Sequence, residues 1–154
     1  MNTYILVSNK KFHTAIFDKL KREIVANWEF IDSSEALTYD QLKKLSPTYL
    51  FFLHWSEKIR EEVYSNFNCI VFHMTDLPYG RGGSPLQNLI VRGHVKTKLS
   101  AIKVVEEIDA GAVYLKKELS LSGAAREIFE RTSVLMYNMI CEIIDTNPVP
   151  LEQT

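Results

Sequence analysis

Residues Thr48–Leu53, with the sequence TYLFFL, are apolar at nearly every position. A strand that is covered on both faces has this pattern, and such strands occur mainly in parallel sheets. Cys69–Phe72 repeats the pattern, and Thr3–Val7, TYILV, is a β-rich run near the start of the chain. Trp28–Ile31 is a further candidate strand. The first half of the chain therefore predicts a set of parallel strands.

Helical segments are predicted between these strands. Apolar residues recur every four positions in Lys11–Val25 (Phe12, Ile16, Leu20, Ile24), which predicts an amphipathic helix. Tyr39–Leu45 is predicted as a short helix, and Glu57–Phe67 is long enough for a crossover helix. The alternation of strand and helix favours an α/β fold with an open, mostly parallel, Rossmann-like sheet and helices on both faces.

The second half of the chain has a different organisation. His73–Gly83 is rich in glycine and is predicted to be a loop, and Ser84–Pro85 is suited to start a helix. Leu99–Val105 and Val113–Leu121 are predicted strands, and a last helix starts near residues 122–124. Pro148 and Pro150 are expected to end the structure. No internal repeat or linker is visible, so we expect a single domain over residues 1–154.

The composition is that of an ordinary globular chain, with 46% hydrophobic and 24% charged residues. Eighteen basic and 19 acidic residues give no overall basic field for nucleic acid or an anionic membrane. The absence of a long apolar run or signal peptide favours a cytoplasmic protein, and Cys69 and Cys141 are expected in the core. No histidine or cysteine cluster has metal-ligand spacing. The apolar stripe of the last helix either covers the sheet or pairs with a second subunit, so a monomer and a homodimer are both open.

The densest group of chemistry-bearing residues is the loop His73–Pro85, HMTDLPYGRGGSP, between a strand and a helix. Open α/β sheets bind ligands at the carboxyl ends of their strands. The Arg81 guanidinium offers a fork of donors for a carboxylate or phosphate. Taken singly, His73 is a structural hydrogen-bonding group, Asp76 caps a turn and Arg81 is solvated. Only their combination in one loop favours a functional site.

Two other segments are candidates for chemistry. Asp109 lies in a turn between apolar segments, where its carboxylate is suited to orient an imidazole. The alternative is a turn in which Asp109 bonds its own backbone. The residues His54-Trp55-Ser56 follow a buried strand, and their aromatic and polar groups suit a flat heterocyclic ligand. The alternative is an amphipathic end to that strand.

Together these segments resemble the folate-dependent formyltransferase family. The family loop reads Asn-x-His-Pro-Ser-Leu-Leu-Pro, then Arg-Gly and a proline that opens a helix. This sequence matches it at His73, Leu77-Pro78, Arg81-Gly82 and Pro85, with Thr75 at the serine. Ile108–Gly111, IDAG, matches the Leu-Asp-Thr-Gly turn of the family. The wording of residues 72–88 is similar to that of small sugar N-formyltransferases of pseudaminic acid biosynthesis.

The resemblance implies transfer of the formyl group of 10-formyltetrahydrofolate to a nucleotide-linked amino sugar of the UDP-4-amino-4,6-dideoxy-N-acetyl-altrosamine type. It assigns proton transfer to His73, orientation of His73 to Asp109, and stabilisation of the oxyanion to Thr75. The folate is assigned to Phe52, Leu53, His54, Trp55, Ser56, Ile108 and Gly111. The nucleotide-sugar is assigned to Lys10, Lys11, Asp76, Tyr79, Arg81, Gly82, Gly83 and Asn88. No metal is implied.

One position departs from the family. The asparagine that precedes the family histidine by two residues, and holds the formyl oxygen, is Val71 here. The formyl oxygen could instead be held by Thr75, Asn88, His54 or a backbone N–H group, and the sequence does not decide among them. The extra carboxyl-terminal domain of larger members has no counterpart in this sequence, so no nucleic-acid partner is expected. The alternatives are a non-sugar acceptor (an aminoacyl group, a purine precursor or water) and a non-catalytic folate- or nucleotide-sugar-binding module, which Val71 favours.

Overall fold

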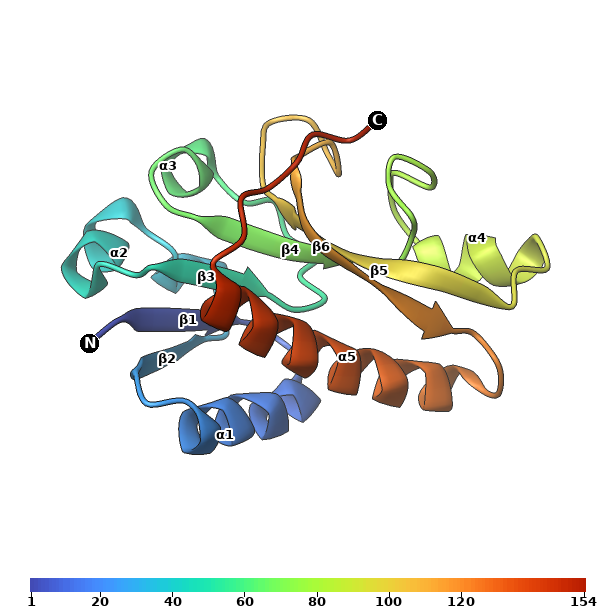
Figure 1. Ribbon diagram of the computed structural model, residues 1–154. Coiled ribbons are helices and arrows are strands. Elements are labelled where there is room, and N and C mark those ends of the chain that lie inside the picture. Colours follow the sequence, from blue (N-terminus) through green and yellow to red (C-terminus); the bar gives the residue numbers. More distant parts are fainter. The chain divides into compact units, whose positions relative to one another are not determined.

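The computed structural model describes all 154 residues, and these divide into two compact units. Unit 1 comprises Met1–Val71 and unit 2 comprises Phe72–Thr154. The chain has the predicted α/β fold with an open, mostly parallel sheet, in which strands and helices follow one another as in Figure 1. None of the helices combines the length and the apolar character that crossing a bilayer requires.

Unit 1 is built on parallel strands. β1 (Thr3–Val7) pairs with β2 (Asn27–Ile31) on one side and with β3 (Tyr49–Phe52) on the other. β4 (Cys69–His73) begins in this unit and pairs with β3 from Cys69 to Val71. All residues of β3 are buried, as the TYLFFL segment predicts. Burial raises the pKa of the Cys69 thiol in β4 to about 12, so that thiol is a neutral core group.

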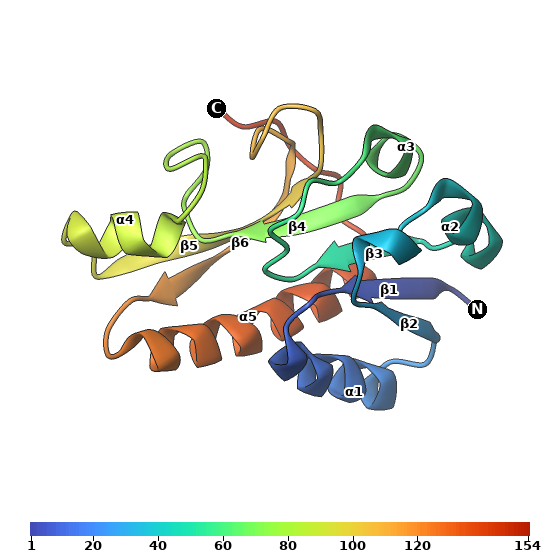
Figure 2. The same cartoon turned by 180° about the vertical axis from the view of Figure 1, so that it is seen from behind.

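The first helical segment of unit 1 begins as a 3₁₀ turn, η1 (Lys11–His13), and continues as α1 (Thr14–Glu23). This turn changes the inward face that the sequence predicts, because a 3₁₀ turn holds fewer residues than an α-helical turn. His13 is fully buried and Phe12 is 56% exposed, so the prediction of a buried Phe12 is wrong. α1 packs on β2 through Phe17 and Phe30, and both ribbon views show the two side by side (Figures 1 and 2). The Trp28 indole donates to the Ile24 carbonyl at 3.1 Å.

The remaining helices of unit 1 are short. They are η2 (Ser34–Ala36), α2 (Tyr39–Leu45) and α3 (Glu61–Tyr64). α2 has the predicted bounds, and the Thr38 side chain caps its start by accepting from the Gln41 amide. The predicted helix Glu57–Phe67 is wrong in extent, because only Glu61–Tyr64 is helical. The Ser65 and Asn66 side chains donate to the carbonyls of Glu61 and Glu62, and such bonds compete with helix continuation.

Unit 2 consists of a loop, two helices and a β-hairpin. α4 (Pro85–Val91) follows the loop, and β5 (Lys96–Lys103) and β6 (Val113–Ser120) pair antiparallel. α5 (Ala125–Thr146) starts where predicted and packs on β6 and β5 (Figure 1). Its buried face comprises Ile128, Thr132, Met136, Met139, Ile140 and Ile143. The apolar stripe that the sequence predicts for this helix comprises Ile128, Leu135, Met136, Met139, Ile140, Ile143 and Ile144. Leu135 and Ile144 are only partly buried.

The segment after α5 returns to the hairpin. Val113 and Leu151 exchange two backbone hydrogen bonds, of 2.7 and 2.8 Å, so the chain forms an isolated antiparallel bridge with β6. The expectation that the prolines at 148 and 150 end the structure is therefore wrong. Proline lacks a backbone donor, but the residue that bridges to Val113 is Leu151, which supplies both its N–H and its carbonyl.

Candidate active site

His73 lies at the end of β4 and is only 7% exposed. Its Nε2 is 2.7 Å from the carbonyl oxygen of Gly80. A carbonyl only accepts, so Nε2 carries the proton in the neutral ring and Nδ1 is the basic nitrogen. Nδ1 faces Asp109 Oδ2 at 3.6 Å. The geometry thus identifies the nitrogen that is able to take up a proton, and the carboxylate that stands beside it.

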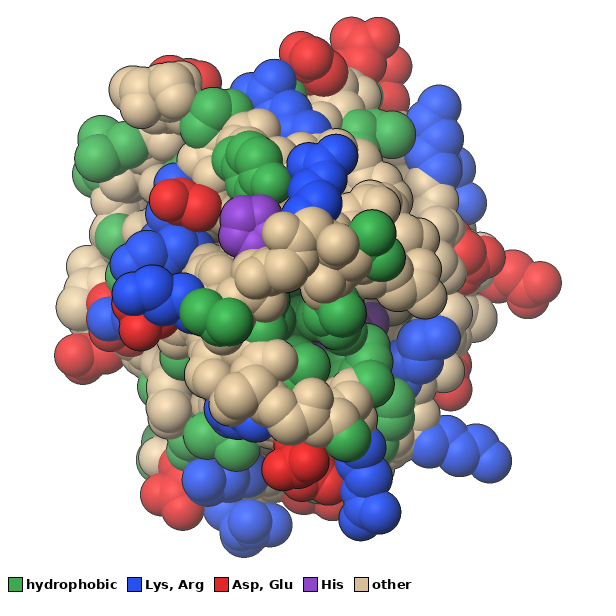
Figure 3. All heavy atoms as spheres, turned by 90° about the vertical axis from the view of Figure 1, so that its right-hand side faces the viewer, with side chains coloured by type: hydrophobic (Ala, Val, Ile, Leu, Met, Phe, Trp, Pro, Cys, Tyr) green, Lys and Arg blue, Asp and Glu red, His purple; other side chains and the backbone are tan.

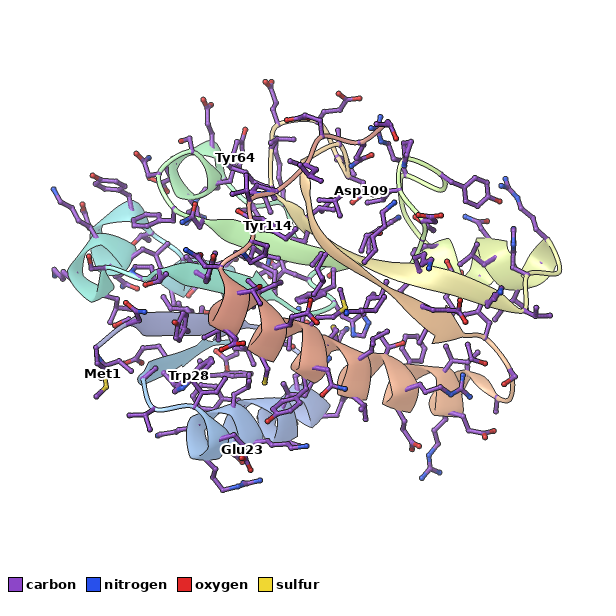
Figure 4. All side chains as sticks on the ribbon, viewed as in Figure 1. Met1, Glu23, Trp28, Tyr64, Asp109 and Tyr114 are labelled. Carbon is purple, nitrogen blue, oxygen red and sulfur yellow. The ribbon has the colours of Figure 1, made fainter.

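Asp109 occupies the turn between β5 and β6, where Figure 4 labels it. Its backbone is left-handed, with φ +57°, a conformation in which Asp and Asn are enriched. Oδ2 accepts from the Gly82 amide at 2.8 Å, and the side chain is 14% exposed. The carboxylate thus joins the turn to the glycine-rich loop and to the imidazole. This contact pattern differs from the simple local turn that the sequence left open.

Thr75 is nearly fully buried, at 1% exposure. Its hydroxyl lies 3.5 Å from the Gly80 carbonyl oxygen, and its own carbonyl accepts from the Ser100 hydroxyl at 2.7 Å. Gly80 has φ +75°, and a Cβ there would lie 2.5 Å from Thr75 Cγ2, so a glycine is required. Thr75 therefore packs against Gly80 of the loop. Its role as an oxyanion donor stays a prediction.

The side chains of unit 2 that were assigned to the acceptor already have protein partners. Arg81 donates to Gln153 Oε1 through Nε and Nη2, at 3.2 and 2.8 Å. Lys116 Nζ is 2.6 Å from Asp76 Oδ1. The remaining contacts are Tyr79 with His94 and Arg92 (3.0 and 3.3 Å), the Asn88 amide with the Gly83 carbonyl (3.5 Å), and the Gly82 amide with Asp109. The Leu77–Pro78 peptide bond in this loop is cis.

The candidates in unit 1 differ in exposure. Phe52 and Leu53 are core residues, at 1% and 0% exposure, so only their backbone is available to a ligand. Trp55 is partly buried, its ring contacts that of Phe52, and its Nε1 is a buried donor without a hydrogen-bond partner. Ser56 is exposed, as are Lys10 and Lys11. Of the other folate candidates, Ile108 is 74% exposed and Gly111 is in close contact with the Lys103 backbone.

The structure adds a buried polar chain in unit 1 that sequence analysis missed. Ser8 Oγ is 2.5 Å from His13 Nδ1, and His13 Nε2 is 3.2 Å from His54 Nδ1. Burial, with smaller contributions from His54 and Lys10, lowers the pKa of His13 to about 4. Burial and Lys10 also lower the pKa of His54. The pattern that could have indicated this chain is the polar Ser8 directly after an apolar strand.

Gln153 is the second residue that was missed. Besides accepting from Arg81, its Nε2 donates to the carbonyls of Asp109 and Gly111, at 2.7 and 2.9 Å. Nothing in the local sequence indicates these bonds, because they depend on the return of the chain to β6.

No group of three or more His, Cys, Asp or Glu side chains is arranged to hold a metal ion. On the face in Figure 3, acidic and basic side chains are interspersed.

Comparisons with known proteins agree with this fold. No protein-family model matches the chain. The methionyl-tRNA formyltransferase of Thermotoga maritima is 33% identical over 95 residues, or 60% of this chain and 30% of that protein. The solved methionyl-tRNA formyltransferase from Clostridium thermocellum is 45% identical with a TM-score of 0.95, over 100% of this chain and 69% of that one. A likely sugar N-formyltransferase from Mycobacterium tuberculosis shares the fold, with TM-score 0.76 and 14% identity over 99% of this chain and 72% of that one.

An α/β fold with an imidazole and a carboxylate meeting at a glycine-rich loop is the arrangement that the family resemblance implied. The chain belongs to the folate-dependent formyltransferase family. It spans 30% to 41% of the length of the curated relatives. The narrower resemblance to sugar formyltransferases of pseudaminic acid biosynthesis is not supported, since the more similar relatives are named for methionyl-tRNA.

Proposed function

We propose that this protein transfers the formyl group of 10-formyltetrahydrofolate to an amine. The observation that carries the proposal is the His73–Asp109 pair, with Nδ1 and Oδ2 at 3.6 Å beside the Gly82 amide. These residues occupy the positions that match the histidine loop and the Asp-containing turn of the family.

In this reaction the amine attacks the formyl carbon, a tetrahedral oxyanion forms, and tetrahydrofolate leaves. The attacking amine must lose a proton, and the departing folate nitrogen must gain one. His73 Nδ1 is the group that accepts the proton from the amine and then returns it to the folate nitrogen, because Nε2 is committed to the Gly80 carbonyl. The Asp109 carboxylate then faces the new positive charge. General acid–base catalysis of this kind contributes about 10²–10⁴-fold to the rate.

For the formyl donor, we propose contacts with Phe52–Ser56 and with Ile108 and Gly111. The first segment fits a flat heterocycle because the partly buried indole of Trp55 supplies an apolar surface beside Phe52. The buried side chains of Phe52 and Leu53 restrict their contribution to backbone groups. The donor supplies the activated formyl carbon and needs no metal for this chemistry.

For the acceptor, an aminoacyl amine is the first candidate. The relative from Clostridium thermocellum, whose name specifies methionyl-tRNA, is 45% identical over the whole of this chain. The second candidate is the amine of a nucleotide-linked sugar, which the amino-acid sequence of residues 72–88 favours. Lys10, Lys11 and Arg81 are the cations proposed to contact a phosphate group in either case.

A binding module without turnover is the remaining alternative. Val71, at the family asparagine position, leaves the formyl oxygen without that amide donor. Among the proposed substitutes, Asn88 is exposed, with its amide 3.5 Å from the Gly83 carbonyl, whereas Thr75 is buried. Asn88 is therefore the more accessible of these two donors.

The test is release of tetrahydrofolate from 10-formyltetrahydrofolate in the presence of a panel of acceptors. The panel comprises methionyl-tRNA, a nucleotide-linked 4-amino sugar, glycinamide ribonucleotide and water alone. We expect formylation of one amine, and a loss of about 10²–10⁴-fold in kcat for His73→Ala. Asp109→Asn keeps the acceptor for the Gly82 amide but loses the charge, so it is also expected to fold and lose transfer.

His94→Ala is the matched control, because His94 is an exposed imidazole of the same unit. It is expected to retain the wild-type kcat. The comparison is made in kcat and not in the KM for the acceptor, because His94 Nε2 lies 3.0 Å from the hydroxyl of Tyr79. Near-wild-type turnover of His73→Ala or Asp109→Asn would remove the roles assigned to these residues. Binding of the donor without turnover of any acceptor would favour the binding module.

A further inference from the structure

The carboxamide of Gln153 uses its full hydrogen-bonding capacity within unit 2. Nε2 donates to the carbonyls of Asp109 and Gly111, at 2.7 and 2.9 Å. Oε1 accepts from Nε and Nη2 of Arg81, at 3.2 and 2.8 Å. A carboxamide offers two donor hydrogens and two acceptor lone pairs, so all four are engaged. Gln153 thereby connects the Asp109 turn with the glycine-rich loop.

The backbone around Gln153 is itself anchored. Leu151 is bridged to Val113 through two hydrogen bonds, and Val113 is the first residue of β6. The carboxamide is therefore held from the same strand that follows the turn. Little rotamer freedom is left to a side chain with four partners, which favours a fixed orientation.

The two carbonyls that Gln153 holds flank Ala110 and belong to the turn that carries the carboxylate. Because Asp109 has a left-handed backbone, the direction of its side chain depends on the geometry of this turn. On the loop side, Arg81 directly precedes Gly82, whose amide donates to Asp109 Oδ2. Gln153 thus acts on both sides of the contact that sets the distance between Asp109 and His73.

We propose that Gln153 is a positioning residue of the formyl-transfer site, whose carboxamide fixes the Asp109 turn against the Arg81–Gly82 segment. The inference rests on the proposed function, since the pair that it positions is the one assigned to proton transfer. Gln153 itself makes no hydrogen bond with His73 in the structure. Its effect on the reaction passes through Asp109 and, separately, through Arg81.

Two substitutions separate these effects. Gln153→Glu retains an acceptor for Arg81 but has no donors, and places a carboxylate against the carbonyls of Asp109 and Gly111. Gln153→Met removes both the donors and the acceptor. The control is Gln87→Glu, which makes the same chemical change at an exposed position of α4.

We expect Gln153→Glu to lower kcat by about tenfold to a hundredfold, since small misplacements of catalytic groups have effects of that size. The KM for the acceptor should stay within about twofold, because the Arg81 contact is retained. Gln153→Met should lower kcat and also raise that KM. Gln87→Glu should leave both constants unchanged.

A second measurement does not require activity. Hydrogen exchange of the Gly82 amide, compared with that of Leu99 in β5, reports whether Asp109 still accepts from it. Exchange at Gly82 should accelerate by about tenfold or more in Gln153→Glu while Leu99 is unchanged. Wild-type kcat or wild-type Gly82 exchange in this variant would overturn the proposal. If the wild-type protein formylates no acceptor, the proposed function fails, and the exchange measurement alone then decides whether Gln153 positions the turn.

Discussion

The two units each contain a paired imidazole, and the pairs are built in opposite ways. In unit 1, His13 is fully buried between the Ser8 hydroxyl and the His54 ring. In unit 2, the His73 ring lies between the Gly80 carbonyl and the Asp109 carboxylate. The two hydrogen-bond partners of His13 are the uncharged hydroxyl of Ser8 and the ring of His54, whereas His73 has the carboxylate of Asp109 beside it. The same side chain thus has uncharged hydrogen-bond partners in one unit and a carboxylate beside it in the other.

The difference also concerns what holds each pair in place. The pair in unit 1 is held by burial, which disfavours the charged ring and lowers the pKa of His13 to about 4. The pair in unit 2 is held by a turn, through the left-handed Asp109 and its contacts with Gly82 and Gln153. Acid is therefore expected to act on the first pair, and backbone changes on the second.

The largest effect is expected from Gly111→Ala, which acts on the turn of unit 2. A Cβ at this position would lie 1.6 Å from the carbonyl oxygen of Lys103 and 2.7 Å from its carbonyl carbon. Both are backbone atoms, so the hairpin itself must shift. We expect a loss of about 4 kcal/mol or more in the free energy of unfolding, measured by urea denaturation.

Gly83→Ala provides the control for this substitution, since no atom lies within 4 Å of its Cβ position. It should change the free energy of unfolding by less than about 1 kcal/mol. Equal stability of the two variants would show that the turn yields, and would remove the contrast between a rigid turn and a buried pair.

The next effect is the acid sensitivity of unit 1. Well above pH 6.5 the His13 ring is neutral in both the folded and the unfolded chain, so it adds no pH dependence there. Between pH 6.5 and about 4, the unfolded chain takes up a proton that the folded chain does not. Stability should therefore fall through this window by up to about 3 kcal/mol. His54, whose pKa is also lowered, adds to the loss in the same direction.

His13→Gln tests this assignment. The variant should be less stable at pH 7 because it disturbs the contacts with Ser8 and His54, but its stability should fall less steeply between pH 6.5 and 4. Urea denaturation at several pH values in this window measures both. His94→Gln, which replaces an exposed ring, should keep the wild-type slope. An unchanged slope in His13→Gln would contradict burial as the feature that distinguishes the pair in unit 1.

The smallest effect is expected from Ser8→Ala. The Ser8 hydroxyl contacts His13 Nδ1 and accepts from the Lys10 amide at 3.1 Å, and both partners lose it. We expect a loss of about 1 to 2 kcal/mol in the free energy of unfolding. Ser56→Ala, at an exposed position, is the control. A neutral result for Ser8→Ala would mean that His13 is held by packing alone.

The sequence predicts the strands of unit 1 well because their apolar runs are local. TYLFFL identifies β3, and the alternation of strands and helices identifies the α/β fold. The extent of α3 could not be predicted, because its start depends on the extended backbone of Arg60, and at its end the Ser65 and Asn66 side chains bond to carbonyls of the helix. The inward position of His13 depends likewise on a 3₁₀ turn that the spacing of apolar residues does not indicate.

In the candidate site, the motif residues could be named from the sequence, but their contacts could not. His73 and Asp109 are brought together by the pairing of β5 with β6 and by the fold of the loop. The tautomer of His73 depends on the backbone carbonyl of Gly80, and no pattern of side chains in the sequence indicates that contact. Gln153 enters the site only because Leu151 bridges to Val113. Such contacts are decided by tertiary structure.

The left-handed backbone at Asp109 has a consequence for any collection of random substitutions at this position. Branched residues such as valine would be eliminated by the conformation of the chain before their chemistry was ever tested. Asparagine and glycine would survive that filter, and only asparagine would keep an oxygen for the neighbouring amide. A selection for turnover at codon 109 would therefore combine two requirements, one for the left-handed backbone and one for the role in proton transfer that we propose for Asp109.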